Sequence, residues 1–426
     1  MPTQLTDANN WKKVRLDQCF ALQQGKQVSK KNRIGDNQRP FLRTANVFWG
    51  RLDLTELDKM HFTPQEELKF ALRKGDLLVC EGGDIGRTAI WNDEIERCYY
   101  QNHLHRLRKL DDSIDEQFAQ FYLQYAFKYA KLFAGRANVT TIPNLSQSRL
   151  GELEMPLPKL NEQISISKIL STIQNAISSQ EKLLDKQFEL KRNLMQHLFT
   201  YGTKSEKTKL TEIGEMPESW DIIELGKICD LFNGYAFKSS DYIEISKTVN
   251  IRMSNIRPGG HFDLEYSLKY LPDNYLEKYQ QFQLKDGDLI IAMTDMANDP
   301  KILGIPTLVK KPNGINMLLN QRVGKLSIVS DGKIQVSFLR YYLTQSSIQD
   351  YFKGLAKKGV QVNIGKSDIL SVRVKLPSIS EQKRISEILN LIDTKIVLVQ
   401  NKYELYQELF KTLLNELMSG KRRVKN

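Results

Sequence analysis

Three short stretches contain residue types that enzymes use, and the first resembles a phosphate-binding loop. Residues 359–367, GVQVNIGKS, end in glycine, lysine and serine. In a phosphate-binding loop the backbone N–H groups surround the phosphates, the lysine neutralises them, and four residues separate the two glycines. Five residues separate Gly359 from Gly365 here. The spacing favours a turn or a DNA-facing loop over a nucleotide site.

The other two stretches would suit a nuclease or a methyltransferase. Residues 272–273 (PD) and 299–301 (DPK) loosely resemble the metal-binding acids and the lysine of a nuclease. Residues 81–87, EGGDIGR, are rich in glycine but lack the G-x-G-x-x-G spacing. No two prolines are adjacent, so the proline pair of DNA aminomethyltransferases is missing. We expect no catalysis, no metal site and no cofactor in this chain.

The cysteines and the hydropathy indicate a cytoplasmic protein without a zinc site. Cys19, Cys80, Cys98 and Cys229 show no CxxC spacing, and the five histidines do not cluster beside them. Unpaired cysteines are typical of a reducing cytoplasm, where they serve as small apolar side chains. The N-terminus is polar, and no apolar run approaches the roughly 18 residues of a membrane span.

Composition and charge are compatible with two or three globular cores and a polyanionic partner. The 426 residues are 41% hydrophobic and 26% charged. The net charge of +12 is distributed along the whole chain rather than in one tail. A distributed basic excess suits a protein that lies along a polyanion, because neutralised phosphates supply affinity that does not depend on sequence.

The sequence contains an internal repeat, which decides the architecture. From Phe133 and Phe352 onward, matched residues are separated by 219 positions for more than sixty residues. Closer to the start of each copy the separation is 209. The pairs at that separation are Trp11 with Trp220, Gly25 with Gly234, Arg43 with Arg252, and Asn46 with Asn255. The separation of matched residues therefore changes along the first part of each copy and stays constant along the last part.

Each copy ends in a long amphipathic helix that begins after a Leu-Pro pair. Apolar residues step by three and four along both segments, as in a coiled-coil seam. The first seam contains Ile166, Leu170, Ile173, Ile177, Leu184, Leu194 and Leu198, and its middle is polar. The second contains Ile385, Leu389, Ile392, Ile396, Val399, Tyr403, Tyr406, Phe410, Leu413 and Leu417. About 39 residues give a helix near 60 Å long, so we expect the two to pair with each other, antiparallel.

The predicted fold class is α+β, with two tandem mixed α/β domains, each followed by one of these helices. Short apolar runs after Gly-Asp pairs predict buried strands at 77–80 and 289–292. Aromatic residues at helical spacing predict core-facing helices at 115–133 and 336–352. The predicted segments are a first domain at 1–156, a central helix at 157–203, a second domain at 204–375 and a C-terminal helix at 376–426.

Taken together, these features resemble the specificity (S) subunit of type I restriction-modification systems. The resemblance lies in a tryptophan at each domain entrance, a KGDLLV-type strand, and an LPxxxEQ start of each long helix. Those residues are Trp11, Leu157, Pro158, Glu162 and Gln163, and in the second copy Trp220, Leu376, Pro377, Glu381 and Gln382. The likeness covers nearly the whole chain.

The resemblance implies a DNA-binding, non-catalytic subunit of a restriction system. Each globular part would be a target recognition domain that reads one half of a split, asymmetric DNA site. The paired helices would set the spacer and dock two methyltransferase subunits, and restriction subunits would complete the nuclease. S-adenosylmethionine, ATP and magnesium would be used in DNA methylation and cleavage by those partners, and not by this chain.

Candidate DNA contacts are basic or amide residues in loops, where glycine permits close approach to the duplex. They are Lys26, Lys30, Lys31, Arg33, Arg87, Arg136, Asn138, Thr140, Lys238, Lys301, Lys357, Lys358 and Gln361. The arginine and asparagine that recur in both copies, Arg43 with Asn46 and Arg252 with Asn255, favour a shared structural turn. Bases differ between half-sites, so a base-reading residue is not expected to recur.

One alternative remains compatible with the helices, namely a coiled-coil scaffold that carries two protein-binding modules. Such a scaffold would retain DNA only weakly and without sequence preference. A DNA reader would keep its preference for one split site as the salt concentration rises.

Overall fold

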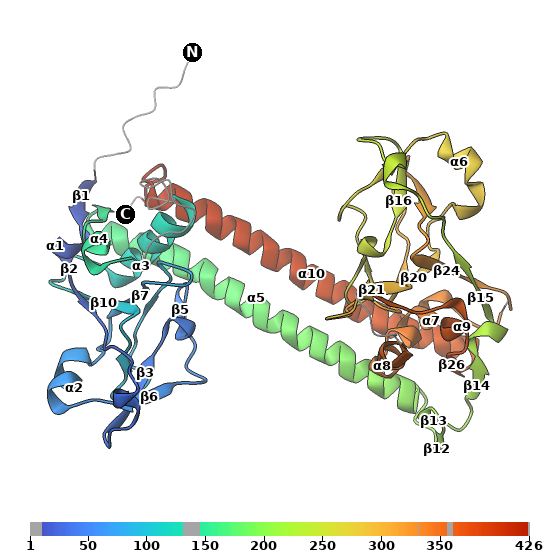
Figure 1. Ribbon diagram of the computed structural model, residues 1–426, viewed down its shortest axis with the longest axis horizontal. Coiled ribbons are helices and arrows are strands. Elements are labelled where there is room, and N and C mark those ends of the chain that lie inside the picture. Colours follow the sequence, from blue (N-terminus) through green and yellow to red (C-terminus); the bar gives the residue numbers. More distant parts are fainter. Residues whose placement is uncertain (1–10, 131–144, 331, 356–360, 425–426) are drawn as a thin grey trace, which may run out of the picture. The chain divides into compact units, whose positions relative to one another are not determined.

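The computed structural model describes residues 11–130, 145–330, 332–355 and 361–424, which form two compact units (Figure 1). Unit 1 combines Met1–Lys182 with Gln400–Asn426, and unit 2 is Leu183–Val399. The long helices α5 (Leu160–Tyr201) and α10 (Ile379–Met418) each contribute to both units. These units differ from the segments predicted from the sequence, in which each long helix forms a segment of its own.

Unit 1 contains a four-stranded antiparallel sheet in the order β2-β10-β7-β8, a three-stranded sheet β6-β3-β9, and the pair β1-β11. Its strands are β1 (Lys12–Arg15), β2 (Phe20–Gln24), β3 (Gln38–Leu42), β4 (Val47–Phe48), β5 (Arg51–Leu52), β6 (Asp58–His61), β7 (Leu77–Cys80), β8 (Thr88–Ile90), β9 (Tyr99–Tyr100), β10 (Leu104–Lys109) and β11 (Glu154–Leu157). Its shorter helices are α1 (Leu16–Cys19), η1 (Lys31–Arg33), η2 (Thr44–Asn46), α2 (Pro64–Phe70), α3 (Glu116–Gln124), the π turn η3 (Tyr125–Tyr129) and α4 (Gln147–Gly151).

Unit 2 repeats this topology with sheets β15-β24-β20-β22 and β19-β16-β23 and the pair β14-β26, which confirms the predicted duplication. Its strands are β12 (Thr208–Thr211), β13 (Gly214–Pro217), β14 (Asp221–Glu224), β15 (Cys229–Asn233), β16 (Thr248–Ile251), β17 (Ile256–Arg257), β18 (His261–Phe262), β19 (Tyr270–Leu271), β20 (Leu289–Ala292), β21 (Thr294–Met296), β22 (Pro306–Leu308), β23 (Asn316–Leu319), β24 (Val323–Ile328), β25 (Gln361–Asn363) and β26 (Arg373–Leu376). Its shorter helices are η4 (Leu225–Lys227), η5 (Ser239–Asp241), η6 (Met253–Asn255), α6 (Tyr275–Lys278), η7 (Gln280–Phe282), α7 (Val336–Leu343), α8 (Ser346–Leu355) and α9 (Lys366–Leu370).

The Gly-Asp pairs start the central strands for a local reason. Gly75 has a φ of +89°, a left-handed conformation that glycine adopts without a steric penalty. The Asp76 carboxylate accepts a hydrogen bond from the Arg73 N–H at 2.7 Å and binds the Arg108 guanidinium at 2.6 and 2.7 Å. The turn therefore closes on itself, and the following strand β7 is buried at every position.

The aromatic helices face the core, as predicted. Phe118 and Phe121 of α3 and Phe338 of α7 are fully buried. Between α3 and the end of each copy, the separation of matched residues falls from 220, as for Phe118 and Phe338, to 219. The π turn η3 lies at this point, and a π turn accommodates one extra residue in a helix.

Each unit contains an antiparallel stretch of the α5–α10 pair (Figure 1). In unit 1 the start of α5, at Ile166 and Leu170, shares a core with the end of α10 at Leu414 and Leu417. In unit 2 the end of α5, at Phe199, shares a core with Ile385 and Leu389 at the start of α10. Every predicted seam position is buried or half-buried.

At one position along the helix pair, unit 2 contains a half-buried cluster of charged side chains. The Asp393 carboxylate lies 2.6 Å from Lys191 Nζ and 2.8 Å from Arg340 Nη2, and it accepts a hydrogen bond from the Tyr341 hydroxyl at 2.8 Å. Burial raises the pKa of Asp393, but the charge and hydrogen bond of Lys191, the Tyr341 hydrogen bond and the Arg340 charge together outweigh it, so the pKa is lowered.

The matching positions of unit 1 carry uncharged side chains. Repeat register aligns Arg340 with Gln120, Tyr341 with Phe121, Asp393 with Gln174, and Lys191 with Phe410. Phe121 and Phe410 pack edge to face with ring centroids 6.0 Å apart. The same position of the helix pair is therefore occupied by an ion-pair cluster in unit 2 and by two packed aromatic rings in unit 1.

Candidate nucleic-acid interface

The signature residues at the helix starts form one polar joint in each unit. In the first joint, the Glu162 carboxylate accepts hydrogen bonds from Trp11 Nε1 at 3.3 Å and from Arg423 Nε and Nη2, both at 2.7 Å. The Arg423 guanidinium also lies over the Trp11 ring, 4.9 Å from its centroid. The hydrogen bond with Arg423 is the main reason that the pKa of Glu162 is lowered.

The second joint repeats this arrangement in unit 2. Glu381 accepts hydrogen bonds from Trp220 Nε1 at 3.3 Å and from the Thr203 N–H at 2.9 Å, and it lies 3.4 Å from Lys204 Nζ. Lys204 and Arg423 are matched by the repeat, and each follows the end of a long helix. Each helix start is therefore fastened to the segment that leaves the other helix.

The glutamine beside each glutamate fastens the helix start to the aromatic helix. Gln163 Nε2 donates to the carbonyls of Pro158 and Ser113, and its Oε1 accepts from the Asp115 N–H at 2.9 Å. Gln382 makes the same three bonds in unit 2. The LPxxxEQ pattern thus has a structural explanation, and these roles were not predicted from the sequence.

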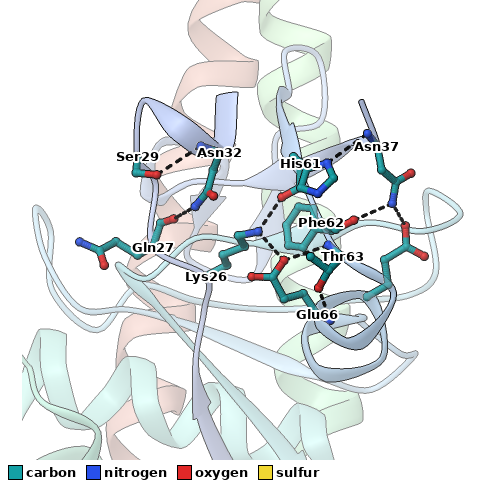
Figure 2. A network of polar contacts seen from close by, with 10 residues as sticks. Lys26, Gln27, Ser29, Asn32, Asn37, His61, Phe62, Thr63 and Glu66 are labelled. Atoms are coloured by element: carbon teal, nitrogen blue, oxygen red, sulfur yellow. Dashed lines mark hydrogen bonds and ion pairs between the residues drawn. The ribbon is translucent and has the colours of Figure 1, made fainter. Parts of the chain in front are cut away.

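Lys26, a predicted DNA contact, lies inside the first domain (Figure 2). Its side chain is 6% exposed, and Nζ donates to the His61 carbonyl and to Glu66 Oε2, both at 2.6 Å. The ammonium lies over the Phe62 ring, 4.8 Å from the centroid. A lysine that is already neutralised and buried does not suit a phosphate contact, so the prediction that Lys26 contacts DNA is wrong.

The three basic candidates that follow Lys26 in the sequence do reach the surface. Lys30, Lys31 and Arg33 are exposed on or beside η1, and Arg33 has a carboxylate, that of Asp58, only at 3.8 Å. The neighbouring Ile34 is 81% exposed. This short turn therefore places three cations and one aliphatic side chain in solvent.

Arg87 is engaged within unit 1. Its side chain is 16% exposed, Nη2 donates to the Thr44 carbonyl at 3.0 Å, and the guanidinium lies 5.4 Å from the Phe48 ring centroid. Arg51 lies over the same ring at 4.8 Å and is exposed. Arg51 was not predicted and is the more accessible of the two arginines.

The candidates of unit 2 are accessible but scattered. Lys238 is exposed next to η5, and Lys301 is paired at 3.0 Å with Asp299, which is itself exposed. Gln361 is exposed at the start of β25 and accepts a hydrogen bond from Arg322, a residue that the sequence reasoning missed. Five further candidates lie outside the described residues, namely Arg136, Asn138, Thr140, Lys357 and Lys358.

The recurring arginine and asparagine form the structural turn predicted for them. Asn46 Oδ1 accepts from the Arg43 N–H at 2.9 Å, while Nδ2 donates to the carbonyls of Asp53 and Glu56. In unit 2, Asn255 accepts from the Arg252 N–H at the same distance. The amides are fully used in holding the turn.

The enzyme-like stretches serve local structure where they are described. Asp273 accepts hydrogen bonds from the Lys247 N–H and the Thr248 hydroxyl. The Gly365 N–H donates to Asp368 at the start of α9. Within the described ranges, no three His, Cys, Asp or Glu side chains are grouped to hold a metal ion.

The four cysteines are buried and unpaired. Burial raises the pKa of Cys80 and Cys229 to about 11 and that of Cys98 to about 12, so these thiols stay protonated at neutral pH. None of the helices described is both long and apolar enough to span a bilayer.

Comparison with known proteins identifies the family. The model of the type I restriction modification DNA specificity domain matches residues 8–186 and 217–406, one match in each copy. The chain therefore belongs to this family of specificity subunits. Its relatives include the type I restriction enzyme MjaVIII specificity subunit of Methanocaldococcus jannaschii, which is 33% identical over 72% of this chain and 71% of the relative.

A more distant relative and a solved structure are also similar to this chain along most of its length. The type I restriction enzyme EcoBI specificity subunit of Escherichia coli is 20% identical over 97% of this chain and 86% of the relative. The crystal structure of a type I restriction-modification S subunit from M. genitalium has the same fold, with a TM-score of 0.59 and 19% identity. It covers 97% of this chain and 98% of that subunit.

Proposed function

We propose that this chain reads a split, asymmetric site on double-stranded DNA, with one half-site for each recognition domain, and that it catalyses no reaction itself. The observation that carries the proposal is the repetition of one strand topology in two units with different surface residues. A common scaffold with unlike surfaces suits two half-sites of unlike sequence, since base edges are read by the residues that vary.

In this proposal the chain acts in the cytoplasm, in a complex with two methyltransferase subunits and with restriction subunits. S-adenosylmethionine, ATP and magnesium serve those partners. The surface candidates for DNA contact in the described part of the chain are Lys30, Lys31, Arg33, Lys238, Lys301 and Gln361. The masses of the reconstituted complex in native mass spectrometry are expected to show two methyltransferase subunits for each copy of this chain.

Binding selection on random duplexes, with the methyltransferase partner present, tests the reading of DNA. We expect two short motifs separated by a spacer of fixed length, and we expect the preference to persist as salt rises, because specific contacts add to the phosphate term. A single contiguous motif would contradict the proposal. Weak retention without sequence preference would instead support the scaffold alternative.

We also propose that the helix pair sets the spacer. Both helices pass from one unit to the other, at 182–183 in α5 and at 399–400 in α10. Inserting seven residues at both places keeps each apolar seam nearly in phase, because seven residues are close to two turns. The helices lengthen by about 10 Å, and the preferred spacer should grow by about three base pairs at 3.4 Å each.

The control for this experiment is the same insertion in α5 alone, which shifts its seam against α10 and should abolish specific binding. The double insertion should leave both half-sites unchanged. An unchanged spacer, or an altered half-site, would show that the helix pair does not act as the ruler.

A further inference from the structure

The segment between β2 and β3 is an exposed loop with a rigid base (Figure 2). We call residues 27–37 the basic loop. Asn32 Nδ2 donates to the Gln27 carbonyl at 2.9 Å, which closes the loop across its first turn. At the far end, Asn37 Nδ2 donates to the Phe62 carbonyl at 2.6 Å and to Glu67 at 2.7 Å.

Gly35 and His61 hold the tip of the loop against the domain. The Asn37 N–H donates to His61 Nδ1 at 3.1 Å. A Cβ at Gly35 would lie 2.3 Å from the His61 ring, so the backbone packs directly on the imidazole. The loop is therefore held in one conformation although its outer side is in solvent.

Lys26 is the main anchor at the entrance of the basic loop. It binds the His61 carbonyl and Glu66, and Glu66 also accepts a hydrogen bond from the Thr63 N–H at 2.9 Å. Burial would raise the pKa of Glu66, but its bonds with Lys26 and Thr63 lower it overall. Lys26 thus ties the loop to the start of α2.

These hydrogen bonds lie on the inner side of the basic loop. The side chains on its outer side remain available to a binding partner. Lys30 and Lys31 form no ion pair among the described residues, and Ile34 is 81% exposed. Single exposed aliphatic residues are common on proteins. Here the aliphatic residue lies on a rigid turn beside three cations, which is the combination that a DNA groove accepts. Cations neutralise phosphates, and an apolar side chain contacts the thymine methyl group in the major groove.

The matched segment of the second copy differs at both the buried lysine and the exposed cations. The stretch from Gly234 to Arg252 has the same length as that from Gly25 to Arg43. In it Tyr235 replaces Lys26, and its ring packs on Tyr279 with centroids 4.5 Å apart. The three exposed cations are replaced by Ser239, Ser240 and Tyr242. Ile243 keeps the aliphatic side chain of Ile34 but is only 43% exposed, so the copies differ in the cations and in how far this isoleucine reaches into solvent. The buried lysine and the outward cations therefore occur together in one copy and are both replaced in the other.

We propose that the basic loop enters the major groove of the first half-site, with Lys30, Lys31 and Arg33 on phosphates and Ile34 against a thymine methyl group, and that the buried Lys26 is the positioning residue that holds it there. The proposal rests on the reading of split DNA by this chain. In this proposal, the salt-dependent part of the affinity for the first half-site comes from the basic loop.

The phosphate contacts are tested by salt dependence, using the full chain with its methyltransferase partner and the selected duplex. The variant K30Q/K31Q/R33Q should reduce the slope of log K against log salt by about 3, since each phosphate contact contributes roughly 0.9. The control Lys74→Gln, at an exposed lysine of unit 1 that is not a candidate contact, should leave the slope unchanged. If wild type reads a split site and the triple variant keeps its slope, the loop does not bind phosphates; if wild type reads no split site, the proposed function itself fails.

The apolar contact is tested with uracil, which lacks the methyl group of thymine. Replacing the thymines of the first half-site by uracil should weaken wild-type binding about fourfold for one buried methyl group, and should leave the binding of Ile34→Ser unaffected. A first half-site without thymine, or an equal loss for both proteins, would overturn this contact.

The positioning role of Lys26 is tested by combining variants. Lys26→Met should weaken first-site binding on the order of tenfold in wild type and by clearly less in K30Q/K31Q/R33Q, where only the Ile34 contact remains to be lost, because both changes act through one loop. Additive losses would instead indicate a separate contact. Tyr235→Phe, at the matched position of unit 2, is the control and should not alter first-site binding. If Lys26→Met also weakens binding to a duplex with a scrambled first half-site, the effect is global and the positioning role is rejected.

Discussion

Replacement of Asp393 by alanine is expected to lower the free energy of unfolding by about 3 kcal/mol at pH 7, because it leaves two largely buried cations without their carboxylate. The side chains of Lys191 and Arg340 are each 18% exposed, so water compensates for little of this loss. Urea unfolding followed by circular dichroism measures the effect. Hydrogen exchange in α7 and in the start of α10 shows whether it lies in unit 2.

Unit 1 supplies the matched controls. Gln174→Ala at the equivalent position should cost less than about 1 kcal/mol, since no charge loses a partner. The triple variant D393Q/R340Q/K191F introduces the residues of unit 1 into unit 2, and it should recover most of the stability lost in Asp393→Ala. A triple variant as unstable as the single one would show that these charges are not the cause.

The pH dependence of this contribution follows from the lowered pKa of Asp393. A carboxylate with a lowered pKa stabilises the folded state above its ordinary value of 3.8, and that stabilisation is lost as the pH falls through the folded value. The difference between wild type and Asp393→Ala should therefore shrink below about pH 4.

Replacement of Glu381 by alanine is the second large effect, and we expect it to cost about 3 kcal/mol. The carboxylate is 1% exposed, and its loss leaves the buried Trp220 indole N–H and the Thr203 N–H without an acceptor. Glu381→Gln keeps one acceptor oxygen for the indole, but its amide NH2 replaces the oxygen that accepts from the Thr203 N–H. We therefore expect it to cost about 2 kcal/mol, less than Glu381→Ala.

The first joint provides the comparison. Glu162→Ala should cost about 2 kcal/mol, less than Glu381→Ala, because its partner Arg423 is 41% exposed and partly solvated after the change. Hydrogen exchange should rise near Trp220 in the Glu381 variant and near Trp11 in the Glu162 variant. If either variant raises hydrogen exchange equally in both units, the prediction that each joint stabilises only its own unit is wrong.

Regular spacing explains what could be predicted from the sequence. The seam from Ile385 to Leu417 repeats at three and four residues, and such a repeat is compatible with one structure only, a helix paired along its length. The buried strand at 77–80 was predictable because the preceding Gly75 and Asp76 close a local turn. The separation of matched residues revealed the two copies without any knowledge of their fold.

Contacts distant in the chain could not be predicted in the same way. Glu162 and Arg423 are 261 positions apart, and no periodicity links them. Lys26 looked like a surface charge because lysine is seldom buried, and only the packing of α2 and β6 around it supplies a partner. Exposure is a tertiary property, so a list of basic loop residues mixes anchors such as Lys26 with free cations such as Lys30.

The division of both helices between the units has a consequence for synthesis on the ribosome. Unit 2 is one continuous segment, so all of it is available once residue 399 has emerged. Unit 1 needs the end of α10 and Arg423 to cover Ile166 and to complete the Glu162 joint. At about 5–20 residues per second, the first domain waits for more than 200 residues, roughly ten seconds or longer, with part of its core uncovered. The domain that is translated first is therefore the last to be completed.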